Sequence, residues 1–266
     1  MIVGDIMTSE PVCIRENDLM THARHVLRDN HLHSLPVLDA NGRVTGILDD
    51  HDVLRLQSNR SGVTVNGYAH EFPLITPDMD VRDAARHLLD SRQHRAPVLN
   101  SSTDKSIAGM ISDKDIFHNV HLMKLHRKEV SEIMNTKVTT AYNDDNVSRV
   151  WGNMLEWKYS GIPVISHDDE PLGIVTRSNL MKAGFIRTGN RSADTHDSLS
   201  GDSPKVERVM STPLYSISST TSVSKAIEAL VDHNIGRICV TDDKHLVGMV
   251  DRFSLLRECL DSTCLD

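Results

Sequence analysis

Two polar residues three positions apart follow an apolar, glycine-opened run near the middle of the chain. In residues 109–115, GMISDKD, we expect a strand to end at Ser112, whose hydroxyl then caps the helix that follows. Unpaired backbone N–H groups at such a helix start can receive a phosphate. The carboxylate of Asp115 could accept hydrogen bonds from two ribose hydroxyls. Ser112 and Asp115 therefore form the strongest candidate site, one suited to a sugar joined to phosphate.

The same pattern occurs at three other places with altered side chains. Thr176 with Asn179 retains the hydrogen-bonding groups but loses the negative charge, which predicts a weaker hold on ribose. The other two occurrences begin with a carboxylate instead of a hydroxyl, and their pairs are Asp49 with Asp52 and Asp251 with Ser254. A carboxylate at the phosphate position repels an anionic ligand. We expect these two sites to be empty or to take a ligand without a phosphate there.

The pattern has a second explanation that involves no ligand. A hydroxyl residue followed three positions later by an acidic residue is also the capping box that begins many ordinary helices. For a single occurrence, capping is the stronger explanation. Recurrence of the pattern at the same place in a repeated unit favours a ligand site, most clearly for Ser112 with Asp115 and for Thr176 with Asn179.

The elements that position these residues recur four times along the chain. A short strand-like run is followed by turn-forming residues and by a second apolar run that glycine opens, which predicts a β-hairpin. The first runs span 34–38, 95–99, 161–165 and 237–241, and the second runs open at Gly46, Gly109, Gly173 and Gly248. Before each hairpin, apolar residues recur at helical spacing, in the stretches 19–27, 81–89, 147–155 and 223–231. We assign these stripes, including Trp151, to the core.

Each unit is predicted to run strand, helix, strand, strand, helix, an α/β fold of the α+β type. The last helix begins directly after the hairpin, for example over 50–56 and 113–120, and the segment 117–128 also has a helical pattern. Three units open with a related run, V-x-x-h-M with h an apolar residue, at 3–7, 130–134 and 206–210. The second unit lacks this opening and follows a polar, glycine-containing segment over 57–69.

The V-x-x-h-M opening, the Pro-Val hairpin and the closing Gly-h-h-[Ser/Thr]-x-x-[Asp/Asn] together resemble the CBS (cystathionine β-synthase) domain, and the resemblance covers nearly the whole chain in four copies. We expect copies at 1–58, 68–120, 127–186 and 206–262, with a flexible linker rich in serine, glycine and aspartate at 187–205. The resemblance implies two tandem CBS pairs, copies one with two and three with four, in a flat disc. This architecture is similar to that of the γ subunit of AMP-activated protein kinase.

The resemblance also implies that basic residues beside the hairpins meet phosphates from a central pore. His94, Arg95 and Arg237 stand at this place in copies two and four. A guanidinium group could bind phosphate there through two parallel hydrogen bonds. The alternative is that the arginines are solvent-exposed residues at the edge of a strand.

Further contacts are implied for the adenine base and near the openings of the copies. In the family the hairpin backbone reads the adenine edge, at positions that correspond here to Ala96, Pro97, Ile162 and Pro163. Thr136 and Thr212 lie near the openings of copies three and four and could also approach a ligand.

Composition excludes several other classes of protein. With 29 basic and 37 acidic residues the net charge is −8, which disfavours broad electrostatic binding to nucleic acid or to an anionic membrane. The 15 histidines and four cysteines show no metal-ligand spacing, and no catalytic or dinucleotide fingerprint appears. We expect no metal, no cofactor and no enzymatic activity. The first residues lack the layout of a signal peptide and no long apolar run occurs, so we expect a cytoplasmic protein.

These observations predict a regulatory, energy-sensing protein that binds AMP, ADP, ATP or S-adenosylmethionine. The alternative is a scaffold or transcription-linked interaction protein whose ligand sites are vestigial, which the carboxylates of the first and fourth sites support. The expected partners are a second copy of the chain or a regulated protein. A membrane is not expected as a partner, and nucleic acid is disfavoured.

Overall fold

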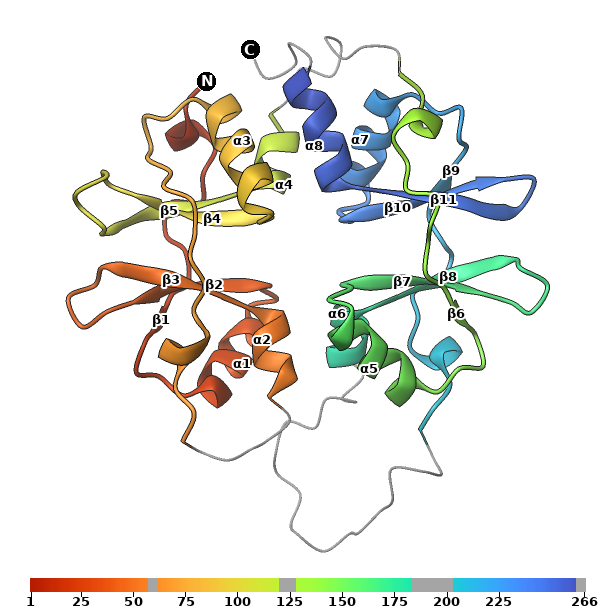
Figure 1. Ribbon diagram of the computed structural model, residues 1–266, viewed down its shortest axis with the longest axis horizontal. Helices are drawn as coiled ribbons and strands as arrows, with labels where there is room; N and C mark the ends of the chain where they lie inside the picture. The colour runs from red at the N-terminus through yellow and green to blue at the C-terminus, as the bar shows by residue number, and fades with distance from the viewer. Residues whose placement is uncertain (57–61, 120–127, 183–202, 262–266) are drawn as a thin grey trace, which may run out of the picture.

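Four repeats of one small unit, numbered here as copies one to four along the chain, make up the molecule (Figure 1). The computed structural model describes residues 1–56, 62–119, 128–182 and 203–261. Copy one contains β1 (Ile14–Arg15), α1 (Met20–Asp29), β2 (Ser34–Leu38), β3 (Val44–Asp49) and α2 (Asp50–Arg55). Copy two contains α3 (Val81–Ser91), β4 (Arg95–Leu99), β5 (Ile107–Ser112) and α4 (Asp113–Phe117). Copy three contains β6 (Ala141–Tyr142), α5 (Val147–Glu156), β7 (Gly161–Ile165), β8 (Pro171–Thr176) and α6 (Arg177–Lys182). Copy four contains β9 (Ser216–Ile217), α7 (Val223–Asp232), β10 (Arg237–Asp242), β11 (His245–Asp251) and α8 (Arg252–Asp261).

Each copy centres on an antiparallel hairpin of the same register. The residue at the hairpin proline position faces an apolar residue of the second strand, in the pairs Pro36–Ile47, Pro97–Met110, Pro163–Ile174 and Cys239–Met249. In copies one, three and four a short first strand adds to the hairpin in parallel. The described sheet of copy two has only β4 and β5. The predicted order of strand, helix, strand, strand and helix is confirmed in copies one, three and four, whereas the described part of copy two lacks the first strand. The second hairpin strand of every copy ends beside the start of a helix.

The helix before each hairpin buries most of the apolar stripe predicted from the sequence. The assignment of Leu19 to the core is wrong, because Leu19 precedes α1 and is 38% exposed. In α3 the side chains of Ala84, Ala85 and Leu88 are fully buried. Helix α3 begins where Asp80 accepts a hydrogen bond from the N–H of Arg82 at 2.8 Å, because an acceptor there satisfies a backbone donor that the helix leaves unpaired. Trp151 packs against the core of copy three, as expected. In the described segments, no helix has the length and apolar character needed to cross a membrane.

The segment that leads into each copy packs into the core of its paired copy. Val3 leads into copy one, but it is fully buried in the core that contains copy two, and its N–H donates to Met79 O at 2.9 Å. Val65 leads into copy two but lies in the core of copy one, with its N–H bonded to Asp18 O at 2.9 Å. The second pair repeats the exchange: Val130 reaches copy four at Thr221 and Val206 reaches copy three at Asp145. This exchange pairs copies one with two and three with four.

The prediction that copy two lacks an opening is wrong. Residues Val65–Tyr68 form a 3-10 helix equivalent to Val3–Asp5, and Val65 is fully buried. The pattern is obscured because Ala69 stands where the other copies have methionine. A Cβ built on Gly46 would lie 2.8 Å from the Cβ of Ala69, so the smaller residue occupies the same place against the hairpin.

Close approach of these lead-in segments accounts for the glycine that opens each second strand. A Cβ on Gly173 would lie 2.5 Å from the carbonyl oxygen of Ser211, and a Cβ on Gly109 would lie 2.7 Å from that of Thr8. Both obstacles are backbone atoms, which no side-chain rotation can move aside. Glycine is therefore required where a lead-in segment crosses the hairpin of the paired copy.

Two segments predicted from the sequence fall largely outside the described residues. The helix α4 ends at Phe117, and residues 120–127 of the predicted helical segment are outside the described part. Of the predicted linker at 187–205, only residues 203–205 are described. Ser203 Oγ and Pro204 O accept hydrogen bonds from the N–H groups of Ser148 and Val147, at 2.9 Å each, so this end is bound to the start of α5.

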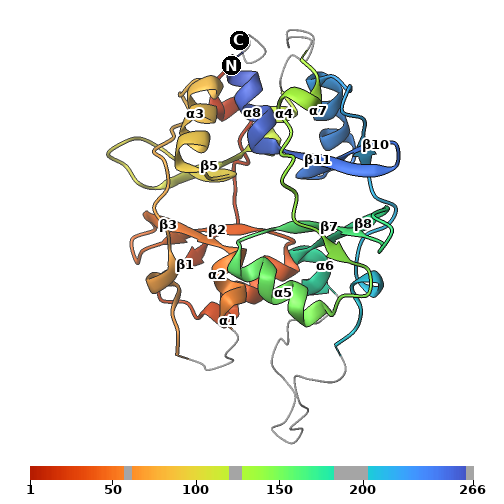
Figure 2. The ribbon, with the colours of Figure 1, turned by 45° about the vertical axis from the view of Figure 1, so that its right-hand side comes forward.

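The two pairs lie side by side and form a disc (Figures 1 and 2). Within each pair the two sheets face one another across the middle of the disc. Copy two lies beside copy four, with α3, α4, α7 and α8 at one end. Copy one lies beside copy three, with α1, α2, α5 and α6 at the other end. The expected arrangement of two tandem pairs in a flat disc is confirmed.

Apolar packing differs between the two ends of the disc. Copies two and four share one continuous hydrophobic core, in which α8 packs against α3 and α4. Copies one and three have separate cores. The boundary between copies one and three therefore depends more on polar contacts, such as the hydrogen bond between the His51 ring and Leu155 O at 2.9 Å.

Candidate functional site

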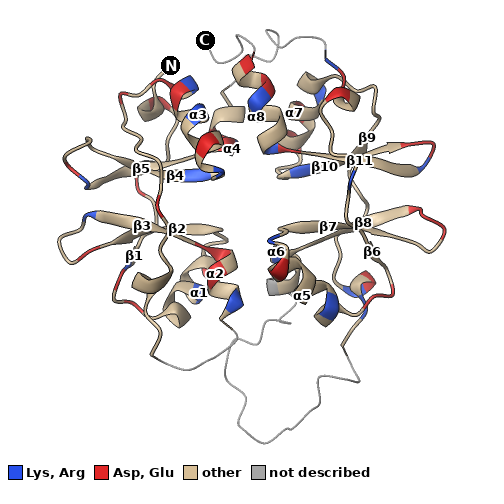
Figure 3. Ribbon diagram, in the orientation of Figure 1, with Lys and Arg blue, Asp and Glu red and all other residues tan. Residues whose placement is uncertain are grey.

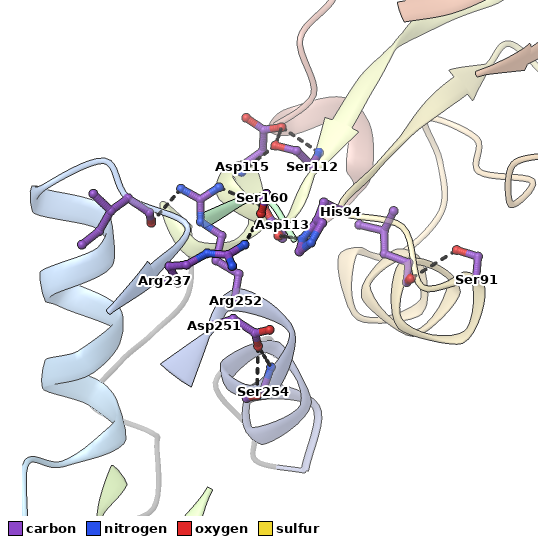
Figure 4. A network of polar contacts seen from close by, with 12 residues as sticks. Ser91, His94, Ser112, Asp113, Asp115, Ser160, Arg237, Asp251, Arg252 and Ser254 are labelled. Carbon is purple, nitrogen blue, oxygen red and sulfur yellow. Dashed lines mark hydrogen bonds and ion pairs between the residues drawn. The ribbon is translucent and has the colours of Figure 1, made fainter. Parts of the chain in front are cut away.

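Ser112 and Asp115 lie at the start of α4 and bond to one another. Asp115 Oδ2 accepts hydrogen bonds from the N–H of Ser112 at 2.8 Å and from its hydroxyl at 2.6 Å, and the N–H of Asp115 points back to Ser112 Oγ at 3.4 Å (Figure 4). This is the capping box that the sequence left as the alternative. Asp115 Oδ1 has no hydrogen-bond partner among the described residues. A ligand hydroxyl could bond to that oxygen without breaking the cap.

Copies three and four cap their helices in related ways. Asn179 Oδ1 accepts from the N–H of Thr176 at 2.9 Å and from its hydroxyl at 2.7 Å, so an amide supports the same cap as a carboxylate. Its Nδ2 donates to Ser211 Oγ at 3.0 Å, in the lead-in segment of copy four. In copy four the roles are reversed, because Asp251 Oδ1 accepts from the N–H and the hydroxyl of Ser254, each at 2.9 Å.

Copy one has carboxylates at both positions and lacks this cap. Asp49 makes no capping hydrogen bond, and Asp52 Oδ2 accepts from the His70 ring of the copy-two lead-in at 2.6 Å. Burial raises the pKa of Asp49, and the nearby carboxylates of Asp50 and Asp52 raise it further, while His70 and Arg95 partly offset the effect. Among the four helix starts this one is the least suited to a phosphate.

Replacing Asp49 with asparagine should stabilise the protein by about 1 kcal/mol at pH 7. A carboxyl group whose pKa is raised by folding disfavours the folded state once it is ionised, and asparagine cannot ionise. The gain should shrink as the pH falls through the raised pKa, because Asp49 then becomes neutral in the parent protein. Urea unfolding across this pH range measures the difference, with Asp168→Asn in an exposed turn as the control. A gain that grows on acidification would contradict the assignment.

Arg95 lies where copy one meets copy two. It begins β4 and is paired in register with Ser112, so it stands beside the start of α4. Its positive charge lies close enough to copy one to offset part of the rise in the pKa of Asp49 and to help hold down the pKa of Asp50. No hydrogen bond to its guanidinium group occurs within the described ranges, which leaves its donors available.

Arg237 holds the equivalent place in copy four but is bound to copy three. Its Nη1 donates to Gly161 O at 3.2 Å and its Nη2 donates to Ser160 Oγ (Figure 4). Burial lowers the pKa of Arg237, and Arg177 and Arg252 act in the same direction, while Asp251 opposes them. The positive charges of Arg177 and Arg252 therefore lie close enough to Arg237 to act on its pKa. Figure 3 shows basic residues on the inner ends of β4 and β10, toward the centre of the disc.

His94 is directed at the boundary between the pairs. Its Nδ1 donates to Asp113 Oδ2 at 2.7 Å, and its ring lies 4.1 Å from the ring of Phe253 in α8. Asp113 Oδ1 accepts from Arg252 Nη1 at 3.2 Å, so that His94, Asp113 and Arg252 form one network across copies two and four (Figure 4).

The same network recurs at the other end of the disc. Asp50 Oδ2 accepts from His33 Nδ1 at 2.8 Å, and Asp50 Oδ1 accepts from Arg177 Nη1 of copy three at 2.5 Å. Burial alone would raise the pKa of Asp50, but the hydrogen bond from His33 and the charge of Arg177 hold it below its usual range. The sequence analysis did not predict His33, Asp50 or Arg177 as site residues. The signal was present, because aspartate follows the hairpin in copies one and two and arginine follows it in copies three and four.

The four hairpin residues predicted to contact the adenine base lie on two opposite faces of their strands. Ala96 and Ile162 belong to the hydrophobic cores, so only their backbone groups could meet a ligand. Pro97 and Pro163 are also buried, on the opposite face by the alternation of a strand.

Thr136 and Thr212 are exposed in lead-in segments that bridge to the paired copy. The residues before them pair with the neighbouring hairpin, Asn135 with Met249 and Ser211 with Ile174. Thr136 therefore stands beside the hairpin of copy four, and Thr212 beside that of copy three.

A cavity of about 380 Å³ lies between copies one and three, away from the predicted ligand residues. It is lined by Arg55, Gly152, Leu155, Glu156 and Lys158. Within the described ranges, no group of three or more histidine, cysteine or acidic side chains is placed to hold a metal ion.

Comparisons with known proteins agree with the repeated fold. Models of the CBS domain match residues 3–59, 68–122, 130–185 and 206–261. The uncharacterized protein MJ1404 of Methanocaldococcus jannaschii is 24% identical over 263 residues, covering 97% of this chain and 62% of that protein, so the chain spans less than two thirds of this relative. The crystal structure of MJ1225 from the same organism, described as a candidate archaeal homologue of γ-AMPK, has 18% identity and a TM-score of 0.78, covering 97% and 99% of the two chains. A conserved protein from Pyrococcus horikoshii has 18% identity and a TM-score of 0.67, with the same coverage.

Proposed function

Because the chain belongs to the CBS domain family, we propose that it is a non-catalytic regulatory protein that binds an adenine nucleotide or a related adenosyl ligand at the start of α4. The candidate ligands are AMP, ADP, ATP and S-adenosylmethionine. The observation that carries the proposal is an oxygen of Asp115 with no partner among the described residues, beside Arg95, whose guanidinium group makes no hydrogen bond within those residues. The ribose hydroxyls would bond to Asp115 Oδ1, and a phosphate would lie toward the guanidinium group of Arg95.

Occupancy would act on a partner by changing the relative stability of two arrangements of the disc, since a ligand shifts an equilibrium only by its difference in affinity for the two states. The proposal includes a cytoplasmic location and a role in sensing the energy state of the cell. The second site of this kind is Thr176 with Asn179, where the amide replaces the carboxylate. Copies one and four are expected to bind phosphate poorly.

Calorimetric titration of the four ligands tests the proposal. Asp115→Asn should lower the affinity about 10- to 100-fold, because a hydrogen bond to a charged group contributes about 1.5–3 kcal/mol. The cap should persist, since Asn179 already supports it in copy three. Ser222→Ala removes the cap of α7 and serves as a control that should leave affinity unchanged. Absence of heat with all four ligands, or equal affinity for the Asp115→Asn variant, would reject ligand sensing at this helix.

A scaffold function is the second candidate, and one observation favours it. The starts of α4, α6 and α8 are each stabilised by hydrogen bonds between their own capping residues. No ligand is therefore needed to hold these helix starts in place. In that case Asp115→Asn would leave the binding of a partner protein unchanged.

A further inference from the structure

The two aspartate–arginine pairs occupy structurally equivalent positions in the four copies. Asp50, Asp113, Arg177 and Arg252 are each the first residue of the helix that follows a hairpin. The backbone N–H of each donates to the carbonyl of the residue before the first hairpin strand, which is His33, His94, Ser160 or Gly236. The first half of the chain, copies one and two, therefore presents aspartate at a position where the second half, copies three and four, presents arginine.

Both carboxylates are buried and use both oxygens. The side chains of Asp50 and Asp113 are 6% and 1% exposed, and those of Arg177 and Arg252 are 13% and 14% exposed. One oxygen of each aspartate is bonded to a histidine of its own half and the other to an arginine of the opposite half. The arginine that forms an ion pair with each aspartate comes from the opposite half.

Equivalent positions meet across each boundary, so the sign of the charge depends on which halves associate. Two first halves would bring aspartate against aspartate, and two second halves would bring arginine against arginine. Buried like charges without counter-charges are strongly unfavourable. The shared apolar core of copies two and four would favour association of any two such halves. A carboxylate in the position of Asp113 is only 1% exposed, so water would not compensate its charge there.

We propose that the Asp50–Arg177 and Asp113–Arg252 pairs form a recognition code by which the first half of the chain accepts the second half and rejects a second copy of itself. A single chain thereby closes its own disc. The surface that a homodimer of CBS pairs would use is occupied within the chain, so association with a second chain must use another face.

Charge-removing changes at one boundary test whether the two charges recognise each other. Asp113→Asn and Arg252→Gln should each lower the melting temperature of the full chain by several degrees, and the double variant should lose clearly less than the sum. The same cycle at Asp83 and Arg86, an exposed ion pair within α3, is the control and should change the melting temperature little. Simple additivity at Asp113 and Arg252 would overturn the proposal.

Charge reversal tests the code itself. A chain with Asp50→Arg and Asp113→Arg carries four arginines at the two boundaries, and we expect its melting temperature to fall by about 10 °C or more. Its sedimentation coefficient should also fall as the halves separate. Adding Arg177→Asp and Arg252→Asp restores opposite charges and should recover most of both losses. A four-arginine chain that stays as compact and stable as the parent would refute the code. So would a charge-exchanged chain that recovers nothing although the Asp113 and Arg252 double-mutant cycle shows coupling.

Discussion

Replacing Val206 with aspartate should unfold copy three, although Val206 belongs to the segment that leads into copy four. The valine is fully buried in the core of copy three, and its N–H bonds to Asp145 O at the start of that copy. An unpaired carboxylate in such a place costs several kcal/mol, about 4 or more. Because the core of copy three is separate from the shared core of copies two and four, the loss should be local.

Hydrogen exchange read by mass spectrometry would locate the damage. We expect faster exchange in α5, β7 and β8, with β10 and β11 of copy four retaining most of their protection. Val12→Asp is a suitable control, because Val12 also lies in a lead-in segment but is 40% exposed. Damage confined to copy four would show that the exchange of lead-in segments does not govern stability.

The repeated elements could be predicted because each copy carries its own local signals. Alternating apolar runs joined by turn residues indicate the hairpins, and helical spacing indicates α1, α3, α5 and α7. The exchange of lead-in segments could not be predicted in the same way. A buried valine such as Val65 looks the same in sequence whether it packs into its own copy or into the neighbouring one.

At the candidate site, too, part of the arrangement could be predicted from the sequence and part could not. Position and residue type placed Ser112 and Asp115 at a helix start, but the sequence could not decide between a cap and a ligand site because both functions need the same two residue types at the same spacing. The structure shows the cap and leaves Asp115 Oδ1 unused among the described residues. Asp113 lies between the two candidates, and its type and position alone do not mark it as a site residue, because an acidic residue in the first turn is ordinary for a helix. Its partner Arg252 is far away in the sequence, and only the fold brings the two together.

Leu256→Ala should weaken copies two and four together, whereas Leu180→Ala should weaken copy three alone. Both leucines are fully buried, and each truncation is expected to cost about 2–5 kcal/mol through lost burial and the cavity left behind. Leu256 in α8 belongs to the core that is continuous from copy four into copy two, and Leu180 in α6 belongs to the separate core of copy three. The two variants therefore lose similar contacts in different cooperative units.

Hydrogen exchange can show whether copies two and four lose their protection together, and whether copy three does so alone. Faster exchange in α3 and α7 together is expected for Leu256→Ala, and faster exchange in α5 without α1 is expected for Leu180→Ala. If the loss in Leu256→Ala stops at copy four, the shared core is not one cooperative unit. If it extends to both copies, the end of the disc at copies two and four moves as one body. Any ligand-driven opening must then occur mainly at the boundary of copies one and three, where Asp50 and Arg177 are the buried ion pair.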